Sequence, residues 1–499
     1  MSHALPSISA ASSVPKDADL IVVGLAEGSS GPYLVGVPDD LEALWAKRHA
    51  TPLLAAARSV GATSKPGTCV VLPGTPGVVV TGLGGVDVTP EQGRRAAGNA
   101  VRAAAAVAGE RTLKVALSLE AIEPEVVRAV AEGALLGAYG YAKHTAKEAS
   151  RPLGSLVVVT KARDARTPIA EASVVASAVC QARDWVNTPP NQLYPETFAD
   201  AARALAREKR LDIEVLDEKA LARGGYGGLL GVGGGSQRPP RLVKLSYAPR
   251  GATLHLALVG KGITFDTGGL NLKPADGMIT MKCDMAGAAA VIAAIGAIAE
   301  LKLPVKVTAW AALAENMPSG SAYRPSDVLT LYGGTTVENV NSDAEGRLVM
   351  ADALARACED SPQLVVDVAT LTGAAVVALG ERVAAVMASD DETADDVLDA
   401  AQSSGESFWH LPIPEEMRTG LSSEVADLSS SGKARWGGAL TAAAFLREFV
   451  TDGVRWAHLD IAGPAWNSGG AYDYVPKGGT GSAVRTLVAL GRNLASRPR

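Results

Sequence analysis

The sequence predicts an α/β protein of two domains: a smaller N-terminal α/β domain, and a larger C-terminal α/β domain with a central mixed sheet flanked by helices. Three observations support this prediction. The chain has 499 residues, which is longer than a domain with a single hydrophobic core usually is. Short β-like runs alternate with Ala-rich helical runs. This alternation is interrupted once, by a long helical stretch that ends in TPPNQLYPE, and then begins again.

The first alternation occupies residues 1–165 and is interpreted as the N-terminal domain. Its apolar runs at 19–26, 68–74, 77–84, 112–119 and 155–161 are typical of strands, and 91–109 and 124–143 are typical of helices. The arginines of RRAAGNAVRAAAA are interpreted as one solvated helix face. This part of the sequence holds no grouping of His, Cys, Asp and Glu that indicates a site.

Residues 166–190 are predicted to form a connecting helix, and 191–499 the second domain. The helix ends at Pro189 and Pro190 because proline cannot continue it. Strands are predicted at 241–248, 253–262, 305–316, 364–373 and 456–463. Several of them end in polar residues: Lys261, Glu315, Thr370 and Asp460. Because ligands of open α/β sheets bind beyond the carboxyl ends of strands, we expect the chemistry at this edge.

Composition narrows the class of protein. The net charge of −6 gives no global attraction to nucleic acid or anionic lipid, although it leaves room for a local basic patch. The cysteines are scattered and form no CxxC pair, which favours a reducing compartment. The N-terminus lacks an apolar signal region, and the apolar run 286–299 is too short to span a bilayer. We therefore expect a soluble cytoplasmic protein with a buried helix at 286–299.

The octapeptide NSDAEGRL, residues 341–348, places Asp343, Glu345 and Arg347 at alternate positions. In an extended segment these side chains would point to one side. Buried charges are costly unless they have partners, so converging carboxylates predict a cation. The alternative is an acidic pair at the N-terminus of a helix, where it complements the helix dipole.

A second stretch, VGKGITFDTGGLNLKPADGMITMKCDM, supplies Lys261, Asp266, Lys273 and Asp284. Together with Asp343 and Glu345 the chain offers a set of carboxylates and lysines without histidine. Such a set suits two divalent ions about 3.5–4 Å apart that share bridging oxygens and activate a water. Mn²⁺ and Zn²⁺ both suit it, and Mg²⁺ is also compatible. By spacing alone, Lys273 could equally be an exposed loop lysine.

These motifs resemble the cytosolic leucine aminopeptidase family of dinuclear metallopeptidases. NSDAEGRL matches the family octapeptide, with Ser342 where the family usually has Thr. The metal-loop stretch, DVATLTGA, AHLDIAGPAW and RDWVNTPPNQLYPE match further family segments, so the resemblance covers about residues 180 to 490. The N-terminal domain is similar only in size and α/β character. The second domain would accordingly be the catalytic domain.

The resemblance implies a role for each matched residue. Asp266 and Glu345 would bridge both metals, Asp343 would complete one site, and Lys261 and Asp284 the other. Lys273 would polarise the scissile carbonyl and hold the oxyanion. Arg347 would hold a bicarbonate ion that acts as general base. Backbone groups of Ala344, Gly346 and Leu371 would share this ion, and the substrate cleft would be lined by Met281, Asn341, Thr370, Leu371 and Gly373. On its own, Met281 would be read as a core residue.

The predicted function is a metal-dependent aminopeptidase that removes leucine and other N-terminal residues from short peptides. The family also implies a homohexamer. One alternative is another two-metal hydrolase such as a phosphoesterase, which would want a further positive phosphate clamp. The other is a DNA-binding architectural or regulatory protein, which the net acidity disfavours because DNA affinity needs clustered Lys and Arg. His458 is interpreted as a hydrogen-bonded structural residue.

Overall fold

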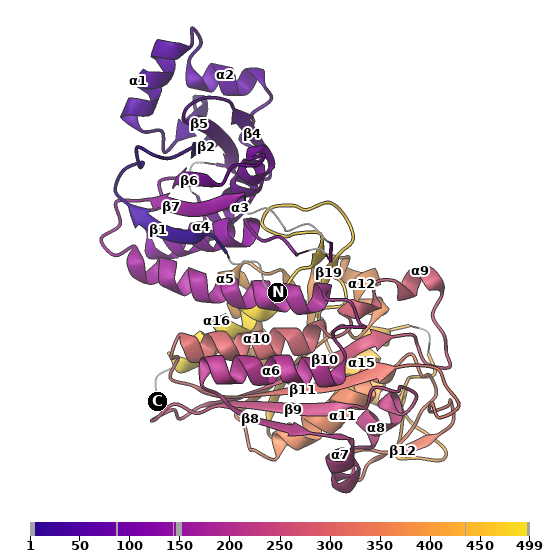
Figure 1. The fold of residues 1–499 in the computed structure, drawn as a ribbon. Helices are drawn as coiled ribbons and strands as arrows, with labels where there is room; N and C mark the ends of the chain where they lie inside the picture. The colour runs from indigo at the N-terminus through magenta and orange to yellow at the C-terminus, as the bar shows by residue number, and fades with distance from the viewer. Residues whose placement is uncertain (1–4, 86–87, 143, 146–151, 435, 497–499) are drawn as a thin grey trace. The chain divides into compact units, whose positions relative to one another are not determined.

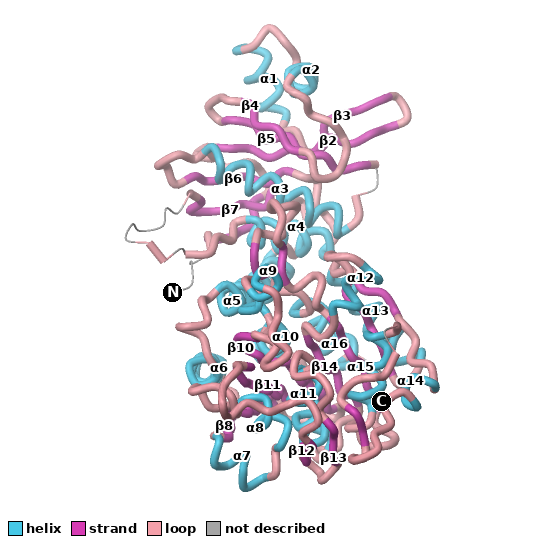
Figure 2. Tube along the Cα trace, turned by 90° about the vertical axis from the view of Figure 1, so that its right-hand side faces the viewer, coloured by secondary structure: helices cyan, strands magenta, loops and turns pink. Residues whose placement is uncertain are grey.

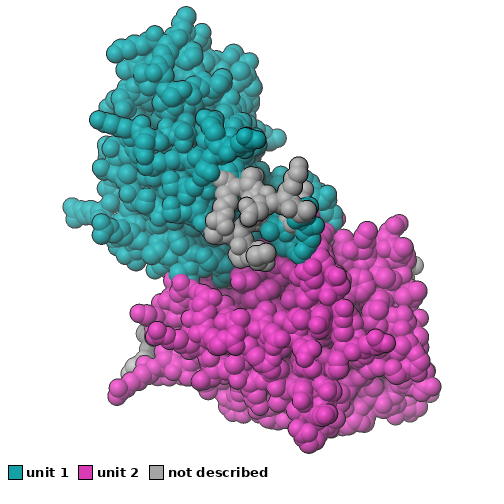
Figure 3. Space-filling view, viewed as in Figure 1, with its two compact units in different colours: residues 1–180, 468–477 teal, residues 181–467, 478–499 magenta. Residues whose placement is uncertain are grey.

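The computed structural model describes residues 5–85, 88–142, 144–145, 152–434 and 436–496 (Figure 1). The chain divides into two compact units, coloured separately in Figure 3. The first comprises residues 1–180 and 468–477, and the second comprises 181–467 and 478–499. The division falls inside helix α5 (Arg166–Asn187), so one helix contributes residues to both units.

The first unit is built on a sheet that has, in its described part, seven strands in the order β1-β7-β6-β2-β5-β4, with β3 paired to β2. The strands predicted from apolar runs are all present. The bounds are β1 Ser7–Ala11, β2 Leu20–Gly28, β3 Gly31–Val35, β4 Cys69–Leu72, β5 Gly77–Gly84, β6 Leu113–Ser118 and β7 Leu153–Val159; the helices are α1 Asp39–Arg48, α2 Leu53–Ser59, α3 Pro90–Val107 and α4 Pro124–Gly137.

The prediction of a solvated arginine face on α3 is wrong for Arg94. This residue is 2% exposed, and its guanidinium forms ion pairs with Glu91 and with Glu132, the latter at 2.9 Å. Arg95 is more exposed and pairs with Glu91 at 2.7 Å. The sequence pattern missed this because the acidic partner Glu132 comes from α4, 38 residues further along. Burial of a charge is tolerated when such partners are present.

The second unit contains the predicted central mixed sheet, with eight strands in the described residues in the order β16-β15-β18-β14-β10-β11-β9-β8. Figure 2 labels four of them, β8, β10, β11 and β14. Strands β18, β14, β10 and β11 are mutually parallel, so their carboxyl ends meet at one edge. The bounds are β8 Asp212–Leu216, β9 Arg241–Tyr247, β10 His255–Asp266, β11 Lys306–Asn316, β14 Leu364–Ala369, β15 Ala384–Ala388, β16 Phe408–His410 and β18 Arg455–Asp460.

Helices α10 and α11 cover opposite faces of this sheet. Successive residues of a strand point to opposite faces. On β10, Val259 belongs to the core cluster that contains Leu348 of α11. The neighbouring Gly260 faces α10, where a Cβ at position 260 would come within 2.6 Å of the Ala288 Cα. The α/β class predicted for the second unit is confirmed.

The remaining elements complete the second unit. Their bounds are α6 Pro195–Lys209, α7 Glu218–Gly224, α8 Gly227–Gly233, α9 Ala275–Met278, η1 Met281–Cys283, α10 Ala286–Glu300, β12 Val328–Thr330, β13 Thr336–Glu338, α11 Glu345–Cys358, α12 Gly373–Leu379, α13 Asp391–Ser404, α14 Glu416–Thr419, β17 Leu428–Ser429, α15 Gly438–Arg447, β19 Trp466–Asn467, β20 Gly478–Gly479 and α16 Val484–Ala495.

Helix α10 is the buried helix predicted at 286–299. It lies within a longer helical span, Ala275–Glu300, that is apolar and long enough to cross a membrane by length and composition. However, 94% of the most apolar window of this span is buried inside the fold. Its apolar surface is therefore accounted for by packing against the sheet and its neighbouring helices.

Candidate active site

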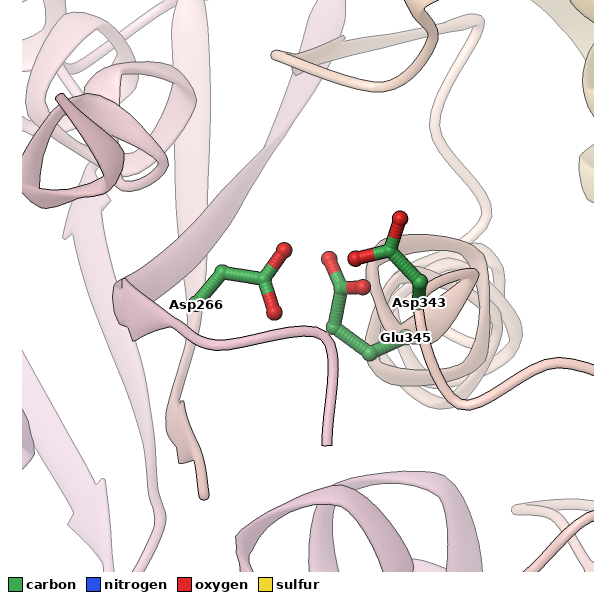
Figure 4. A group of neighbouring side chains, drawn as sticks. All are labelled: Asp266, Asp343 and Glu345. Carbon is green, nitrogen blue, oxygen red and sulfur yellow. The ribbon is translucent and has the colours of Figure 1, made fainter. Parts of the chain in front are cut away.

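Three carboxylates converge at the carboxyl edge of the central sheet. Asp266 is the last residue of β10, Asp343 lies in the turn before α11, and Glu345 is the first residue of that helix (Figure 4). One oxygen from each lies within 4.8 Å of the others, which allows them to share a metal ion. Asp266 and Glu345 are buried, and Asp343 is partly exposed. The side chains come from segments about 80 residues apart, so the fold brings them together.

The predicted extended geometry of NSDAEGRL is wrong. Residues 341–344 form a turn, and α11 begins at Glu345, so Glu345 and Arg347 are helical. Asn341 shapes the turn because its side-chain oxygen accepts the backbone N–H of Asp343 at 3.0 Å. Glu345 does lie in the first helical turn, as the helix-terminus alternative required. It also joins the carboxylate cluster, so the two interpretations are compatible.

Two lysines connect the carboxylates in two sets. Lys261 Nζ lies 2.8 Å from Asp284 Oδ1 and 2.9 Å from Glu345 Oε1. Lys273 Nζ lies 2.8 Å from Asp266 Oδ2 and 2.5 Å from Asp343 Oδ1. The six charged residues thus form two ion-paired sets, and the sets meet where one oxygen each of Asp266, Asp343 and Glu345 lies within 4.8 Å of the others. Lys261 lies inside β10, five residues before its end, and not directly after the strand as predicted.

Close backbone approach makes room for Lys261. Gly346 lies on α11, where glycine costs roughly 1 kcal/mol of helix stability relative to alanine. A Cβ at position 346 would lie 2.6 Å from Lys261 Cε and 2.8 Å from its Nζ. Glycine at this position therefore leaves the space that the lysine side chain needs to reach Asp284 and Glu345.

The charges shift one another's protonation equilibria. Burial alone would lower the pKa of Lys261, but Asp284, Glu345 and Asp266 outweigh it and raise the pKa. The pKa of Lys273 is raised in the same way, chiefly by Asp266 against the effect of burial. Burial together with Glu345 raises the pKa of Asp266 to about 6, although Lys273 and Lys261 oppose this shift.

The donor set fits divalent cations. Within the described residues, Asp284 Oδ2 and Glu345 Oε2 are buried without a hydrogen-bond partner. Four carboxylates also exceed two ammonium groups, so the cluster carries surplus negative charge. Buried acceptors and surplus charge are both costly unless a cation neutralises them. All the donor atoms are oxygen or amine nitrogen, which suits Mn²⁺, Mg²⁺ or Zn²⁺.

Arg347 is buried beside this cluster. One guanidinium nitrogen donates to the backbone oxygen of Ser430 at 2.7 Å, while Nε is buried without a hydrogen-bond partner among the described residues. Burial lowers its pKa to about 10, with Glu345 and Asp460 opposing the change, so it carries a positive charge at neutral pH. A buried cation with a free donor is suited to an anion.

Some of the residues predicted to line the cleft are hydrogen-bonded to the charged cluster. Thr370 accepts Lys261 Nζ at its backbone oxygen at 2.9 Å and donates its hydroxyl to Asp284 at 2.7 Å. Leu371 N–H donates to Asp460 Oδ1 at 3.1 Å. The family resemblance instead implies that the Leu371 backbone binds bicarbonate.

The positions of the other predicted site residues follow from the helices and turns that carry them. Met281 begins η1 and accepts the backbone N–H of Asp284 at 3.3 Å. Gly373 begins α12, and a Cβ there would meet no described atom within 4 Å. Ala344, the N-cap of α11, donates its N–H to the Asn341 backbone oxygen at 3.0 Å. Met281 is therefore part of the turn that carries Asp284, whereas among the described residues no hydrogen bond joins Gly373 to the charged cluster.

Two further polar residues, Asn316 and Asp367, were not predicted from the sequence. Asn316 ends β11 and donates from Nδ2 to Asp266 Oδ1 at 2.8 Å. Its place directly after Glu315 at a strand end was the available signal. Asp367 was also missed: His458 Nδ1 lies 2.5 Å from Asp367 Oδ1, and Trp456 donates to its other oxygen at 2.7 Å. His458 is thus a hydrogen-bonded buried residue, as predicted.

Comparison with known proteins assigns the family. Residues 180–488 match the description "Cytosol aminopeptidase family, catalytic domain" and residues 39–147 match "Cytosol aminopeptidase family, N-terminal domain". The chain belongs to the cytosol aminopeptidase family. The resemblance carried by the sequence motifs is confirmed, and the same matches indicate a peptidase.

Individual relatives cover nearly the whole chain. A probable cytosol aminopeptidase of Cutibacterium acnes is 53% identical over 480 residues, covering 96% of this chain and 94% of the relative. One from Streptomyces coelicolor is 50% identical and covers 95% of each chain. Both relatives carry the word cytosol in their names.

Two solved structures share the fold of the chain. The bottromycin maturation enzyme BotP in complex with Mn has a TM-score of 0.84 at 42% identity, covering 96% of this chain and 100% of that one. A mutant of tomato leucine aminopeptidase has a TM-score of 0.86 at 31% identity, covering 98% and 96%. The predicted two-domain α/β architecture is confirmed by these matches.

Proposed function

We propose that this chain is a metal-dependent aminopeptidase that removes leucine and other N-terminal residues from short peptides. The observation that carries the proposal is the buried cluster of Asp266, Asp284, Asp343 and Glu345, which surrounds two lysines and retains buried oxygens without hydrogen-bond partners. Family membership supports the peptidase chemistry. The Mn complex of a structural neighbour supports a divalent cation.

The carboxylates and Lys261 would hold two divalent cations, and Lys261 would have to give up the proton that it carries in the metal-free site in order to act as a ligand. Asp266 and Glu345 would bridge them, Asp343 would complete one site, and Lys261 with Asp284 the other. When bound, the cations would lower the pKa of water and polarise the substrate carbonyl. Asp284 would also accept the free α-amine of the substrate. A requirement for that amine would restrict the enzyme to the N-terminal residue.

Lys273 and Arg347 would act on the reacting groups. Lys273 is partly exposed, with 19% of its side-chain surface open, so its ammonium can reach a carbonyl oxygen and stabilise the charge that develops there. Arg347 would hold bicarbonate through its buried Nε donor. The bicarbonate held there would supply a general base for the attacking water. Gly346, in the first turn of α11, would contribute its backbone N–H near this anion, and Ala344 and Leu371 could do so only by giving up their N–H bonds to Asn341 and Asp460.

The substrate would occupy the space bounded by Met281, Asn341, Thr370, Leu371 and Gly373. The flexible thioether of Met281 is suited to a hydrophobic side chain at the first substrate position. A cytoplasmic location and a homohexamer are part of the same proposal, on family grounds. Residues 1–165, 166–190 and 191–499 would act as the N-terminal domain, connecting helix and catalytic domain.

Metal removal tests this proposal directly. After exhaustive chelation the protein should lose cleavage of leucine p-nitroanilide and of leucine dipeptides, and Mn²⁺ should restore it. The matched substrate is the same dipeptide with an acetylated N-terminus, which should resist cleavage because the free amine is gone. Undiminished hydrolysis by protein that holds no metal in elemental analysis, or equal cleavage of the acetylated peptide, would refute the proposal.

A further inference from the structure

We propose that Ser342, Asn271 and Asn316 form a hydrogen-bonded clasp whose task is to hold the two carboxylate-bearing segments at metal-binding distance. We call these three residues the Ser342 clasp. They are positioning residues, since they act on Asp266, Asp343 and Glu345. The inference rests on the proposed metal site and adds to it neutral residues that no metal-ligand pattern includes.

Ser342 connects the turn before α11 to the loop after β10. Its backbone N–H donates to Asn271 Oδ1 at 2.9 Å, and its hydroxyl accepts the Asn271 N–H at 2.8 Å. The hydroxyl also lies 2.7 Å from the Gly268 backbone oxygen and 2.9 Å from Asn271 Oδ1, and donates its single hydrogen to one of them. Ser342 is fully buried, so these bonds are shielded from water.

Asn316 forms the second part of the clasp. Its Nδ2 donates to Asp266 Oδ1 at 2.8 Å and to the Ser342 backbone oxygen at 3.0 Å. One amide group thus bonds to a carboxylate of the first segment and to the residue directly before Asp343 in the second. Asn316 is 0% exposed and lies at the end of the neighbouring strand β11, so the clasp is anchored in the sheet.

Packing at the glycines shows that the two segments are in close contact. A Cβ at Gly269 would lie 2.9 Å from Asn316 Oδ1 and 3.0 Å from Ser342 Oγ. A Cβ at Gly268 would lie 2.8 Å from Asp343 Oδ1. Both glycines have positive φ, 84° and 63°, which other residues adopt at a cost. The loop therefore lies directly against the clasp side chains.

The clasp would counteract the repulsion between the carboxylates. Asp266, Asp343 and Glu345 repel one another at their short separations, and the two lysines offset only part of this repulsion because four carboxylates surround them. Neutral hydrogen bonds can do this without adding charge to the site. Residues that orient metal ligands in this way typically change metal affinity by about 10–100-fold when they are replaced.

The test compares Mn²⁺ binding by titration calorimetry in full-length variants, with the melting temperature of the chelated protein as a second readout. Ser342→Ala removes the hydroxyl and should weaken Mn²⁺ binding by about tenfold or more. Ser342→Thr keeps the hydroxyl and should bind Mn²⁺ with an affinity close to that of the parent. A loss in Ser342→Ala with recovery in Ser342→Thr supports the clasp.

Thr308→Val is the matched control for Ser342→Ala. Thr308 lies on β11 like Asn316, is 2% exposed, and its hydroxyl bonds His255 Nε2 at 3.0 Å, so this variant also removes a buried hydroxyl. It should lower the melting temperature at least as much as Ser342→Ala while leaving Mn²⁺ affinity unchanged. If Thr308→Val weakens Mn²⁺ binding as much as Ser342→Ala, the effect is one of general stability and the clasp is overturned.

Asn271→Ala decides the question if Ser342→Ala does not fold. Asn271 is exposed, so its replacement does not disturb the core, yet it removes the acceptor for the Ser342 N–H. Leu272→Ala, a change to an exposed neighbour in the same loop, is its control. Asn271→Ala should weaken Mn²⁺ binding and Leu272→Ala should not. If Ser342→Ala and Asn271→Ala both bind Mn²⁺ as tightly as the parent protein, the clasp is wrong but the metal site stands. If the parent protein itself binds no Mn²⁺, both the metal site and the clasp are wrong.

Discussion

The two lysine-centred halves of the site differ in burial. In the Lys261 half, Lys261, Asp284 and Glu345 have side chains 4%, 6% and 2% exposed. In the Lys273 half, Asp266 is equally buried at 2%, but Lys273 is 19% and Asp343 34% exposed. The first half lies on a strand, a 3₁₀ turn and a helix, while Lys273 belongs to the loop that follows β10.

This difference indicates why two lysines so close together would have different tasks. A buried amine with two carboxylate partners is suited to hold a fixed position. An ammonium at the open side can meet a substrate group that arrives from solvent. The contrast also predicts that loss of Lys261 acts mainly on stability and metal content, and loss of Lys273 mainly on turnover.

The strongest change is expected from Asp266→Ala, because Asp266 joins the two halves. It accepts Lys273 from one side and Asn316 from the other, and it is the proposed bridge between both cations. We expect loss of measurable peptidase activity together with loss of metal, measured by elemental analysis of the purified variant. A variant that retains two ions per chain would remove Asp266 from the bridging role.

Lys261→Met is expected to act next most strongly. Removing one partner of a buried ion pair typically costs about 3–5 kcal/mol because the remaining charge is left uncompensated. Here two buried carboxylates lose their partner, so the free energy of unfolding of the chelated protein should fall by at least that amount, with metal content also reduced. Denaturant unfolding measures this change. An unchanged unfolding midpoint would contradict the stabilising role assigned to Lys261.

Lys273→Ala should be better tolerated by the fold and damaging to the reaction. We expect kcat for leucine p-nitroanilide to fall by about 10²–10³-fold, the usual cost of removing one donor to a developing oxyanion. Both metals should remain bound, and the unfolding midpoint should fall less than in Lys261→Met. A parental rate would show that Lys273 is only a loop lysine.

The smallest expected effect concerns the strand that carries Lys261. His255 begins β10, and burial lowers its pKa to about 4. Since an unfolded histidine titrates near 6.5, the unfolded chain binds more protons between pH 6.5 and 4, and stability falls as the pH is lowered through that range. His255→Gln should remove about 1–3 kcal/mol of this pH dependence. Thermal melts of the parent and the variant at pH 7 and 4.5 test this prediction. An equal fall in melting temperature for both proteins between the two pH values would contradict it.

The strands and the charged residues were predictable because they leave local signals in the sequence. Apolar runs such as GVVVTGLG became β5, and parallel strand ends brought Asp266 and Asp460 to one edge. The local geometry of NSDAEGRL was not predictable from alternation, since Glu345 can begin a helix or continue an extended segment. The turn at Asn341 and the helix that packs on β10 decided between them.

The neutral partners were harder to predict than the charges. Asn316 and Ser342 are unremarkable in composition, and their role depends on contacts between residues 26 positions apart in the chain. Arg94 shows the same limit in the first unit, because only the fold reveals Glu132 as its partner. Residue type indicates that a site needs cations, whereas hydrogen-bond partners from other segments are specified by tertiary packing.

The contact between Gly346 and Lys261 bears on how this enzyme can vary. Even the methyl group of alanine would come within 2.6 Å of Lys261 Cε, so Lys261 would have to move away from its ion-pair partners Asp284 and Glu345. A saturation library at position 346, selected for activity, should return glycine alone, while a library at the more open Asp343 side of the cluster meets less crowding. The same crowding at position 346 would act against substitutions in natural relatives and in laboratory evolution.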